Sequence, residues 1–363
     1  MLRKSVIQVL PNLGLVGGTA AKVKLFAEHS HYQQIICYSA NPKNKIYIGQ
    51  WEKTPNCILE EIDSISNPFT HAYQLYKIAK KYKATIIHVY FPIASISASL
   101  VKVVFPTIKI VRSFEGAIQY SKYKSIAQKM AFKKHDVFIA ISQYIKQYYE
   151  NLFPELRNGR IQVVYNCSSF DIQIDKPIFH DINKKCLVSV GGLNPSKNTE
   201  TLVETVRLLK QKNIFVRAFI LGDGPLRDKI ETMIGQYELQ DRIKLCGFCK
   251  DVIPYLDECS IYVHTANNEG FGMAVVEAMS RYCAVIVSDA CALPELIKDG
   301  EDGLIAQTYD AKDWANKIEW LLSNQSKVNE FGIRAYKKAT TIFSVQKYVT
   351  SIDNIYSNLY EDN

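Results

Sequence analysis

The sequence has no internal repeat and no low-complexity tract, which excludes solenoid and fibrous architectures. Its first residues, MLRKSVIQVLP, hold only about six apolar-leaning residues before Pro11, too few for a signal sequence or a membrane span. Disorder is not expected either, because 47% of the residues are hydrophobic and 22% are charged. We therefore expect a globular protein without a leader or a spanning helix.

The nine cysteines do not form the spaced framework of a secreted disulfide protein. Cys246 and Cys249 make a lone C-x-x-C, but no second cysteine or histidine pair follows at metal-ligand spacing. Two buried or loop thiols therefore explain this pair better than a zinc site does. Scattered cysteines without such a framework favour a protein of the reducing cytoplasm.

Acidic residues are scarce in the first half of the chain. Residues 1–180 hold 11 Asp and Glu against 23 Lys and Arg, a net +12, whereas residues 181–363 hold 25 against 21, a net −4. The first half should therefore attract anions. It lacks a recognisable nucleic-acid-binding module, so we expect no nucleic-acid partner.

Short apolar runs alternate with longer helical patterns over all 363 residues. The runs predicted as strands are 5–10, 33–40, 85–92, 108–114, 136–142, 161–166, 184–192, 216–224, 242–248, 259–266, 283–290 and 302–306. Near-continuous apolar strands between helices predict parallel sheets that are buried on both faces. The expected fold is α/β, with two doubly wound, Rossmann-like domains.

The boundary between these domains is expected in residues 168–185, which lose periodicity and contain Pro177 and several Asp. We expect an N-terminal domain over 1–175 and a C-terminal domain over 176–342. A C-terminal helix over 343–363 is expected to return to the first domain. Ligands should bind in a cleft between the domains, at the carboxyl ends of the strands.

The segment NNEGFGMAVVEAMS, residues 267–280, places two carboxylates around a glycine turn and a helix start. The first amides of such a helix have no intrahelical acceptor and can bind oxygens. Glu269 and Glu277 can each accept hydrogen bonds from two adjacent sugar hydroxyls, which suits a nucleotide sugar. The structural alternative makes Glu269 a partner of the helix dipole and Glu277 a surface residue.

Two further loops carry groups suited to an anion. Gly17 and Gly18 precede a helical pattern, where glycines let backbone amides approach a ligand, although such a pair is more often only a turn. Lys197 lies just before the next predicted helix of its domain, and two positive ends repel unless an anion lies between them. The alternative for Lys197 is a solvated loop lysine.

Glu269 and Glu277, separated by seven residues in EGFGMAVVEAM, resemble the paired-glutamate motif of retaining glycosyltransferase family 4, whose members have the two-domain GT-B fold. VGGLNPSKN, LGDGPLRDKI and SDACALPELIKDGEDGLI are similar to further segments of that family. The likeness covers nearly the whole chain and is stronger over 186–306.

The resemblance implies that the domain over 1–175 binds the acceptor and the domain over 176–342 binds the nucleotide sugar. It also implies a role for each of these residues. Lys197 would hold the donor diphosphate, with help from Gly18 and the helix-start amides of Met273 and Ala274. Glu269 would contact the transferred sugar and Glu277 the ribose. The turn residues between them would also bind the donor, namely Gly270, Phe271 and Gly272. The family needs no metal ion, so the nucleotide-diphosphate sugar is a substrate and no cofactor is expected.

Two positions depart from the family pattern. Gly192 stands where the family usually has an arginine, so one positive contact to the diphosphate is missing. Glu115, in RSFEG, stands where the family usually has a histidine near the donor sugar. It is a candidate catalytic residue that orients an acceptor hydroxyl, or else it caps its loop.

The resemblance implies a retaining hexosyltransferase acting in cell-surface polysaccharide or lipid-linked glycan synthesis. Residues 117–135 combine five lysines with apolar residues, as a helix on an anionic membrane does, so a peripheral location on the inner face of the cell membrane is one reading. An ordinary surface helix is the other. A non-catalytic sugar-binding or scaffold subunit is the alternative function, and Gly192 is its best argument.

Overall fold

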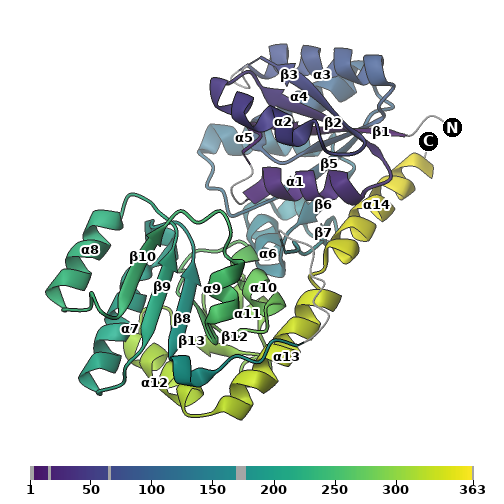
Figure 1. Ribbon diagram of the computed structural model, residues 1–363. Coiled ribbons are helices and arrows are strands. Elements are labelled where there is room, and N and C mark those ends of the chain that lie inside the picture. The colour runs from purple at the N-terminus through teal and green to yellow at the C-terminus, as the bar shows by residue number, and fades with distance from the viewer. Residues whose placement is uncertain (1–3, 15–17, 64–66, 169–176, 362–363) are drawn as a thin grey trace. The chain divides into compact units, whose positions relative to one another are not determined.

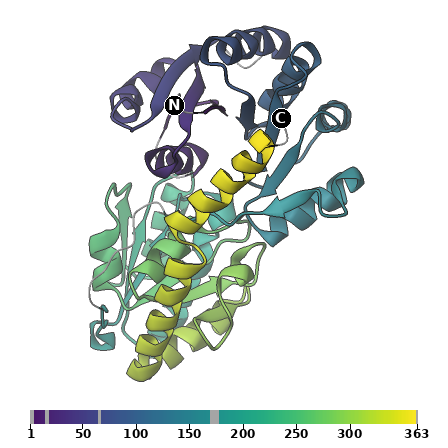
Figure 2. The same cartoon turned by 90° about the vertical axis from the view of Figure 1, so that its right-hand side faces the viewer.

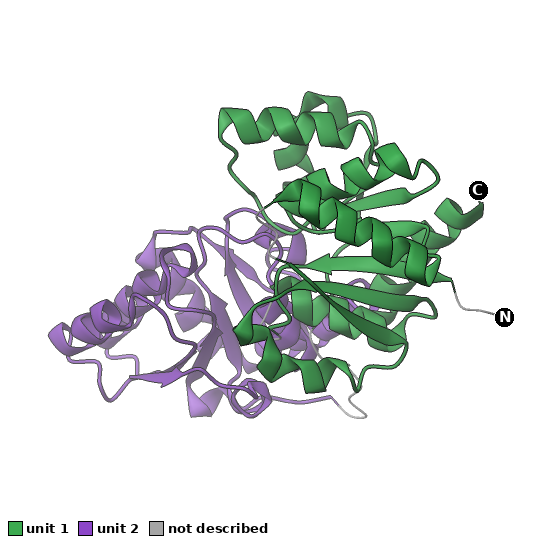
Figure 3. Ribbon diagram, turned by 90° about the horizontal axis from the view of Figure 1, so that it is seen from above, with its two compact units in different colours: residues 1–169, 345–363 green, residues 170–344 purple. Residues whose placement is uncertain are grey.

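The computed structural model describes residues 4–14, 18–63, 67–168 and 177–361 (Figure 1). The chain forms two compact units, which Figure 3 shows in different colours. Unit 1 comprises residues 1–169 and 345–363, and unit 2 comprises residues 170–344. Each unit contains one parallel sheet with helices on both faces, as the sequence predicts for a doubly wound α/β fold.

Unit 1 has a seven-stranded sheet in the order β3-β2-β1-β4-β5-β6-β7, in which all neighbouring strands are parallel. The strands are β1 (Ser5–Leu10), β2 (Gln33–Ser39), β3 (Cys57–Ile62), β4 (Ile86–Val89), β5 (Lys109–Phe114), β6 (Val137–Ala140) and β7 (Ile161–Val163). The order reverses between β1 and β4, and such a reversal is where open α/β sheets bind ligands.

Helices cover both faces of this sheet. They are α1 (Gly18–His29), α2 (Lys45–Trp51), α3 (Pro68–Tyr82), α4 (Pro92–Val104), α5 (Lys122–Phe132), α6 (Gln143–Leu152) and α14 (Val345–Glu361). Ile7 and Val9 face a core with α3 and α4, whereas Val6 faces a core with α1 and α14. This alternation follows from the period of two along a strand. The last helix, yellow in Figure 2, therefore belongs to the core of unit 1.

Unit 2 has a six-stranded parallel sheet in the order β10-β9-β8-β11-β12-β13. Its strands are β8 (Cys186–Val190), β9 (Arg217–Leu221), β10 (Ile243–Gly247), β11 (Ile261–His264), β12 (Ala284–Ser288) and β13 (Leu304–Ala306). Its helices are α7 (Thr199–Gln211), α8 (Arg227–Gln236), α9 (Ile253–Glu258), α10 (Met273–Ser280), α11 (Leu293–Leu296), α12 (Ala311–Leu322) and α13 (Gln325–Thr341). The order reverses once, between β8 and β11.

The α/β class with two doubly wound units is confirmed, but one strand was not predicted. β3 carries the adjacent acids Glu60 and Glu61, which break the apolar run that marks the other strands. It lies at the edge of the sheet, where one side needs no partner strand. Lys81 and the hydroxyl of Tyr82 both donate hydrogen bonds to Glu60, so long-range contacts offset the unfavourable local sequence.

The basic helix expected over 117–135 is shorter than predicted. α5 begins at Lys122, and residues 117–121 ahead of it are not helical. Phe132, counted among the apolar residues of a membrane-facing side, is fully buried and packs against Phe114, Phe138 and Phe153. Within the described ranges, no helix combines the length and the apolar character that crossing a membrane requires.

Candidate functional site in unit 2

The loops that follow β8 and β11 are joined by hydrogen bonds at the point where the strand order of unit 2 reverses. The Asn198 side chain donates to the Thr265 carbonyl at 3.2 Å, and the Thr265 hydroxyl donates to the Lys197 carbonyl at 3.0 Å. The Asn267 amide donates to the Ser196 carbonyl at 2.9 Å. These bonds fix Lys197, at the end of the first loop, beside the second loop.

Lys197 and Glu269 form an ion pair across these two loops. The side chain of Lys197 passes over Gly191, where an added Cβ would lie 3.4 Å from the lysine Cδ. Side-chain exposure is 24% for Lys197 and 18% for Glu269, so both groups remain accessible to a ligand. Because Lys197 is ion-paired with Glu269 and only 24% exposed, it is not a fully solvated loop lysine.

Glu269 has a second partner, which the sequence did not reveal. The imidazole Nε2 of His264, at the end of β11, lies 3.3 Å from the Glu269 Oε2 atom. Burial alone would raise the pKa of Glu269, but the hydrogen bond from His264 and the charge of Lys197 lower it to about 2. Glu269 is therefore a fixed anion near neutral pH.

The glycine turn before α10 depends on Gly272. Its φ is +106°, which favours glycine, and an added Cβ would lie 3.0 Å from side-chain atoms of both Leu293 and Leu296. The amides of Val275 and Val276 donate back to the Gly272 carbonyl. The two earlier amides of α10 have no acceptor within the helix and point out of its N-terminus.

The remaining predicted donor residues lie in or beside this turn. Phe271 is buried, with its ring packed edge-on against Phe343, and Gly270 is half-buried. Glu277 lies in α10 and is half-buried rather than solvated, as its apolar neighbours suggest. After burial, the charge of Glu277 is the largest influence that raises the pKa of Tyr262. The charge of Glu277 therefore acts on the Tyr262 hydroxyl.

Gly192 occupies a confined position in the loop after β8. An added Cβ would lie 3.3 Å from the Asn194 side-chain nitrogen and 3.4 Å from the Asp223 carbonyl oxygen. A larger residue at position 192 would therefore require its neighbours to shift by a few tenths of an ångström. The loop is built around the small residue, and Lys197 is the cation that it brings to Glu269.

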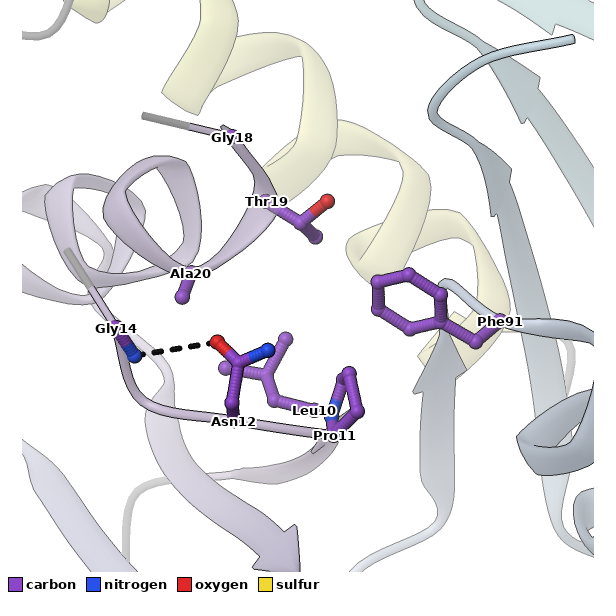
Figure 4. Close-up of a pocket in the computed structure, with 8 residues that line it drawn as sticks. All are labelled: Leu10, Pro11, Asn12, Gly14, Gly18, Thr19, Ala20 and Phe91. Carbon is purple, nitrogen blue, oxygen red and sulfur yellow. Dashed lines mark hydrogen bonds between the residues drawn. The ribbon is translucent and has the colours of Figure 1, made fainter. Parts of the chain in front are cut away.

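Unit 1 holds the other predicted site residues. Gly17 lies outside the described residues, and Gly18 begins α1 with a φ of +74°. A pocket of about 290 Å³ opens between the loop after β1, the start of α1 and the loop after β4 (Figure 4). The described residues that line it are Leu10, Pro11, Asn12, Gly14, Gly18, Thr19, Ala20 and Phe91. None of these side chains is ionisable.

Glu115, which follows β5, forms an ion pair with Lys22 of α1. Lys22 also donates to the Asn166 side chain at 3.1 Å. The side chain of Lys22 is 2% exposed and that of Glu115 is 13% exposed, so this pair is sealed from solvent. The Glu115 Oε1 atom is buried and has no hydrogen-bond partner in the part of the chain that the structure describes.

Several functional candidates escaped the sequence reasoning. His264 is hidden at the end of an apolar strand, where its only signal is a polar ring at the carboxyl end. Thr19, Asn12 and Phe91 belong to no motif, and only the sheet topology brings them together. Nothing in the sequence distinguishes Lys22 from the many other lysines, because its partner Glu115 lies 93 residues away.

Comparison with known proteins agrees with the geometry. The sequence pattern described as "Glycosyltransferase Family 4" matches residues 22–168, and that described as "Glycosyl transferases group 1" matches residues 171–338. Between them these patterns extend from residue 22 to residue 338. The chain belongs to the family 4 glycosyltransferases.

Individual relatives are distant. A poly(ribitol-phosphate) alpha-N-acetylglucosaminyltransferase of Staphylococcus aureus (strain COL) is 24% identical over 249 residues, 67% of this chain and 50% of that protein. An N-acetylgalactosamine-N,N'-diacetylbacillosaminyl-diphospho-undecaprenol 4-alpha-N-acetylgalactosaminyltransferase of Campylobacter jejuni is 24% identical over 190 residues, 52% of this chain and 51% of that protein. The matches thus span about half the length of these relatives.

A solved structure shares the fold over nearly the whole chain. Anabaena HepE, in complex with UDP, has a TM-score of 0.82 with 18% identity, and the match covers 98% of this chain and 100% of that chain. At this identity the likeness concerns the fold. The alternation of strands and helices seen in both units is therefore the architecture of a known glycosyltransferase fold.

Proposed function

We propose that the chain is a retaining, metal-independent hexosyltransferase that moves a sugar from a nucleotide-diphosphate donor to an acceptor hydroxyl. The observation that carries the proposal is the group formed by Lys197, Glu269 and the start of α10 where the strand order of unit 2 reverses. A cation and free helix-start amides suit a diphosphate, and a fixed carboxylate suits sugar hydroxyls.

The reaction requires the bond between the sugar C1 and the diphosphate oxygen to break while the acceptor oxygen bonds to C1 on the same face. Lys197 and the amides of Met273 and Ala274 stabilise the negative charge that grows on the leaving diphosphate. Glu269 holds the transferred sugar. The acceptor attacks from the same face because no obvious protein nucleophile stands in the motif for a double displacement. Its proton passes to the departing diphosphate oxygen, which is a base on that same face.

Other groups would bind the rest of the donor. Glu277, half-buried in α10, would accept hydrogen bonds from the ribose hydroxyls. Gly270 and Gly272 would keep the turn small enough for the diphosphate to approach the backbone. The donor-binding role that the resemblance implies for Gly17 and Gly18 stays a prediction.

We assign the unit 1 pocket to a neutral part of the acceptor, such as a sugar ring. Phe91 offers an aromatic face, and Thr19 and Asn12 offer groups that bind hydroxyls (Figure 4). Glu115 is not among the described residues that line this pocket, and it is paired with the buried Lys22, so we favour a structural role for it over contact with an acceptor hydroxyl.

An anionic membrane surface is the proposed location, on the inner face of the cell membrane. Tyr123, Ile126 and Met130 lie on one face of α5 and are 85%, 50% and 68% exposed. Exposed lysines flank this face, namely Lys122, Lys124, Lys129, Lys133 and Lys134. Apolar residues bordered by lysines suit the interface of an anionic bilayer.

A glycan or lipid-linked glycan of the cell surface would then be the acceptor. The names of the Staphylococcus aureus and Campylobacter jejuni relatives give a poly(ribitol-phosphate) and a diphospho-undecaprenol glycan as acceptors. The exposed basic face of α5 supports an acceptor of this kind, because it would bring the chain to the membrane where lipid-linked glycans lie.

Incubation of the purified protein with UDP-, GDP- and TDP-sugars, with and without bacterial lipid extract, tests the activity. We expect release of one nucleoside diphosphate, faster when the acceptor is present, and retention of the anomeric configuration in the product. A protein that binds a nucleotide sugar but turns over none in either condition would instead be the non-catalytic scaffold that Gly192 suggests.

A further inference from the structure

His264 is a buried polar residue, and packing alone does not explain why a polar ring is buried at this position. Along β11, Ile261 and Val263 belong to the apolar core with α7, and side chains alternate along a strand, so Tyr262 and His264 point to the other face. The His264 side chain is only 3% exposed. Its two ring nitrogens both have partners, Tyr262 on one side and Glu269 on the other.

The direction of these two hydrogen bonds follows from the chemistry of the partners. Burial lowers the pKa of His264, so the ring is neutral near neutral pH and carries one proton. An ionised carboxylate only accepts, so the proton is on Nε2 and the bond to Glu269 is donated by the ring. The Tyr262 hydroxyl, whose pKa is raised by burial, then donates to Nδ1 at 3.0 Å.

Tyr262 therefore sets the tautomer of His264. Its hydroxyl also reaches the Val190 carbonyl, at 3.4 Å, which is the longer of the two contacts. If the hydroxyl turned to Val190, a proton could move to Nδ1, and the bare Nε2 would face the carboxylate of Glu269. The shorter contact to Nδ1 opposes this, as does the repulsion between a ring lone pair and an anion.

His264 matters as a partner of Glu269 because the other partner, Lys197, is needed at the diphosphate. In the proposed function Lys197 binds the donor diphosphate, and a lysine that moves toward the phosphates leaves Glu269 with fewer contacts. A largely buried carboxylate that loses its cation is unstable in place unless another donor holds it. His264 is a neutral donor on a strand, so it does not compete for the diphosphate and it does not move.

We propose that His264 is a positioning residue, which keeps Glu269 aimed at the donor sugar while Lys197 turns to the diphosphate. This inference rests on the proposed function for the identity of the ligand, but the geometry that it requires is testable without any substrate. It assigns the Tyr262, His264 and Glu269 side chains to one hydrogen-bonded chain that begins inside the sheet and ends at the reacting sugar.

The first test compares two amides at position 264. His264→Gln can place an N–H donor near the position of Nε2, whereas His264→Asn can place one only near Nδ1. We expect His264→Asn to lower kcat by about tenfold to a hundredfold, the range of one hydrogen bond to a charged group. His264→Gln should retain most of the turnover, and both variants should bind the free nucleoside diphosphate like the parent protein. Equal losses of kcat in the two variants, at equal melting temperature, would overturn the proposal.

The second test needs no turnover. Nitrogen-15 NMR of histidine-labelled protein, with the His264 signal assigned from His264→Gln, should show a neutral Nε2–H tautomer at neutral pH. The charged and titratable groups around the ring are Tyr262, Glu269 and Lys197. Lys197→Ala imitates the departure of the lysine, and the Nε2–H tautomer should persist in it. A Nδ1–H tautomer or a charged ring in the parent protein, or loss of the Nε2–H tautomer in Lys197→Ala, would overturn the inference.

These two tests separate the inference from the proposed function. The parent protein could turn over no donor while the Nε2–H tautomer is present both in it and in Lys197→Ala. That result would contradict the transferase activity and leave the positioning geometry intact. A parent protein that is active but shows the Nδ1–H tautomer would contradict only the role of His264.

Discussion

Both sheets reverse their strand order once, between β1 and β4 in unit 1 and between β8 and β11 in unit 2. In each unit a lysine and a glutamate pair near the carboxyl ends of the strands. Lys22 and Glu115 are sealed in unit 1, with side chains 2% and 13% exposed, whereas Lys197 and Glu269 in unit 2 are 24% and 18% exposed. Burial decides whether such a pair supports the fold or can exchange its partner for a ligand.

If Lys197 binds the donor diphosphate as proposed, net charge does not locate the anion site. The first half of the chain carries the excess of lysine and arginine, yet none of the described side chains that line its pocket is ionisable. Exposed lysines of unit 1 lie instead at several surface places, including α5 and the residues after it and the C-terminal part of α3 with Lys77, Lys80, Lys81 and Lys83. In unit 2, where acids outnumber bases, the cation that matters is one lysine fixed between two loops.

The largest effect is expected from Lys197→Ala. Loss of the cation should lower kcat/KM by about a hundredfold to a thousandfold, because it stabilises charge that grows as the donor bond breaks. Thermal stability should change little, since the pair is partly exposed. Lys229→Ala is a matched control, because Lys229 pairs with Glu200 at 3.0 Å in the same unit. Comparable losses in both variants would remove Lys197 from the site.

Glu115→Gln should act on stability. It leaves the buried Lys22 ammonium without a counter-charge, which costs about 3 kcal/mol even with the Asn166 contact kept. Glu269→Gln, in the partly exposed pair with Lys197, should lower the free energy of unfolding by much less. Urea denaturation of the two variants side by side makes the measurement. If Glu269→Gln proved the more destabilising, the contrast between a sealed and an open pair would be wrong.

The α5 surface gives a prediction for unit 1 alone. Reversal of Lys129, Lys133 and Lys134 to Glu should release the protein from anionic vesicles, because each lysine near such a surface contributes about 1 kcal/mol. Flotation at moderate salt measures the bound fraction. The control reverses three exposed lysines of unit 2, namely Lys229, Lys250 and Lys312. The proposed membrane contact of α5 would be wrong if the parent protein did not bind anionic vesicles, or if the two triple variants floated with them to the same extent.

Glu269 and Glu277 should fail in different ways. Glu269→Gln should mainly lower turnover, because the amide loses a charge that favours the transition state of the sugar. Glu277→Gln should mainly weaken nucleotide binding, by roughly 1.5 to 3 kcal/mol. Steady-state kinetics and titration with the free nucleoside diphosphate separate the two. Equal loss of affinity in both folded variants would disprove this division.

The sequence predicts most strands and the paired carboxylates because these signals are local. Apolar runs mark buried strands, and residues 267–280 keep Glu269, the turn and Glu277 within one short segment. Other features depend on contacts between distant residues. β3 contains two acids and is recognisable only beside β2. The start of α5 at Lys122 has a local signal that was overlooked, because Ser121 directly before it is a common N-cap residue.

The polar partners were hidden for the same reason. Lys22 and Glu115 lie 93 residues apart, and Lys197 and Glu269 lie 72 residues apart. Charge and spacing do not tell which lysine meets which acid, or how deeply the pair is buried. Those facts follow from strand order, which places the loops after β8 and β11 side by side.

One titration tests most directly the claim that unit 2 binds the anionic donor and unit 1 a neutral part of the acceptor. Whichever of UDP, GDP and TDP binds the parent protein is titrated into Lys197→Ala and into Phe91→Ala, with heat of binding as the signal. We expect Lys197→Ala to weaken binding about tenfold or more and Phe91→Ala to leave it unchanged, while Phe91→Ala raises the KM of the acceptor several-fold. Undiminished binding by Lys197→Ala, or an equal loss in Phe91→Ala, would contradict the account.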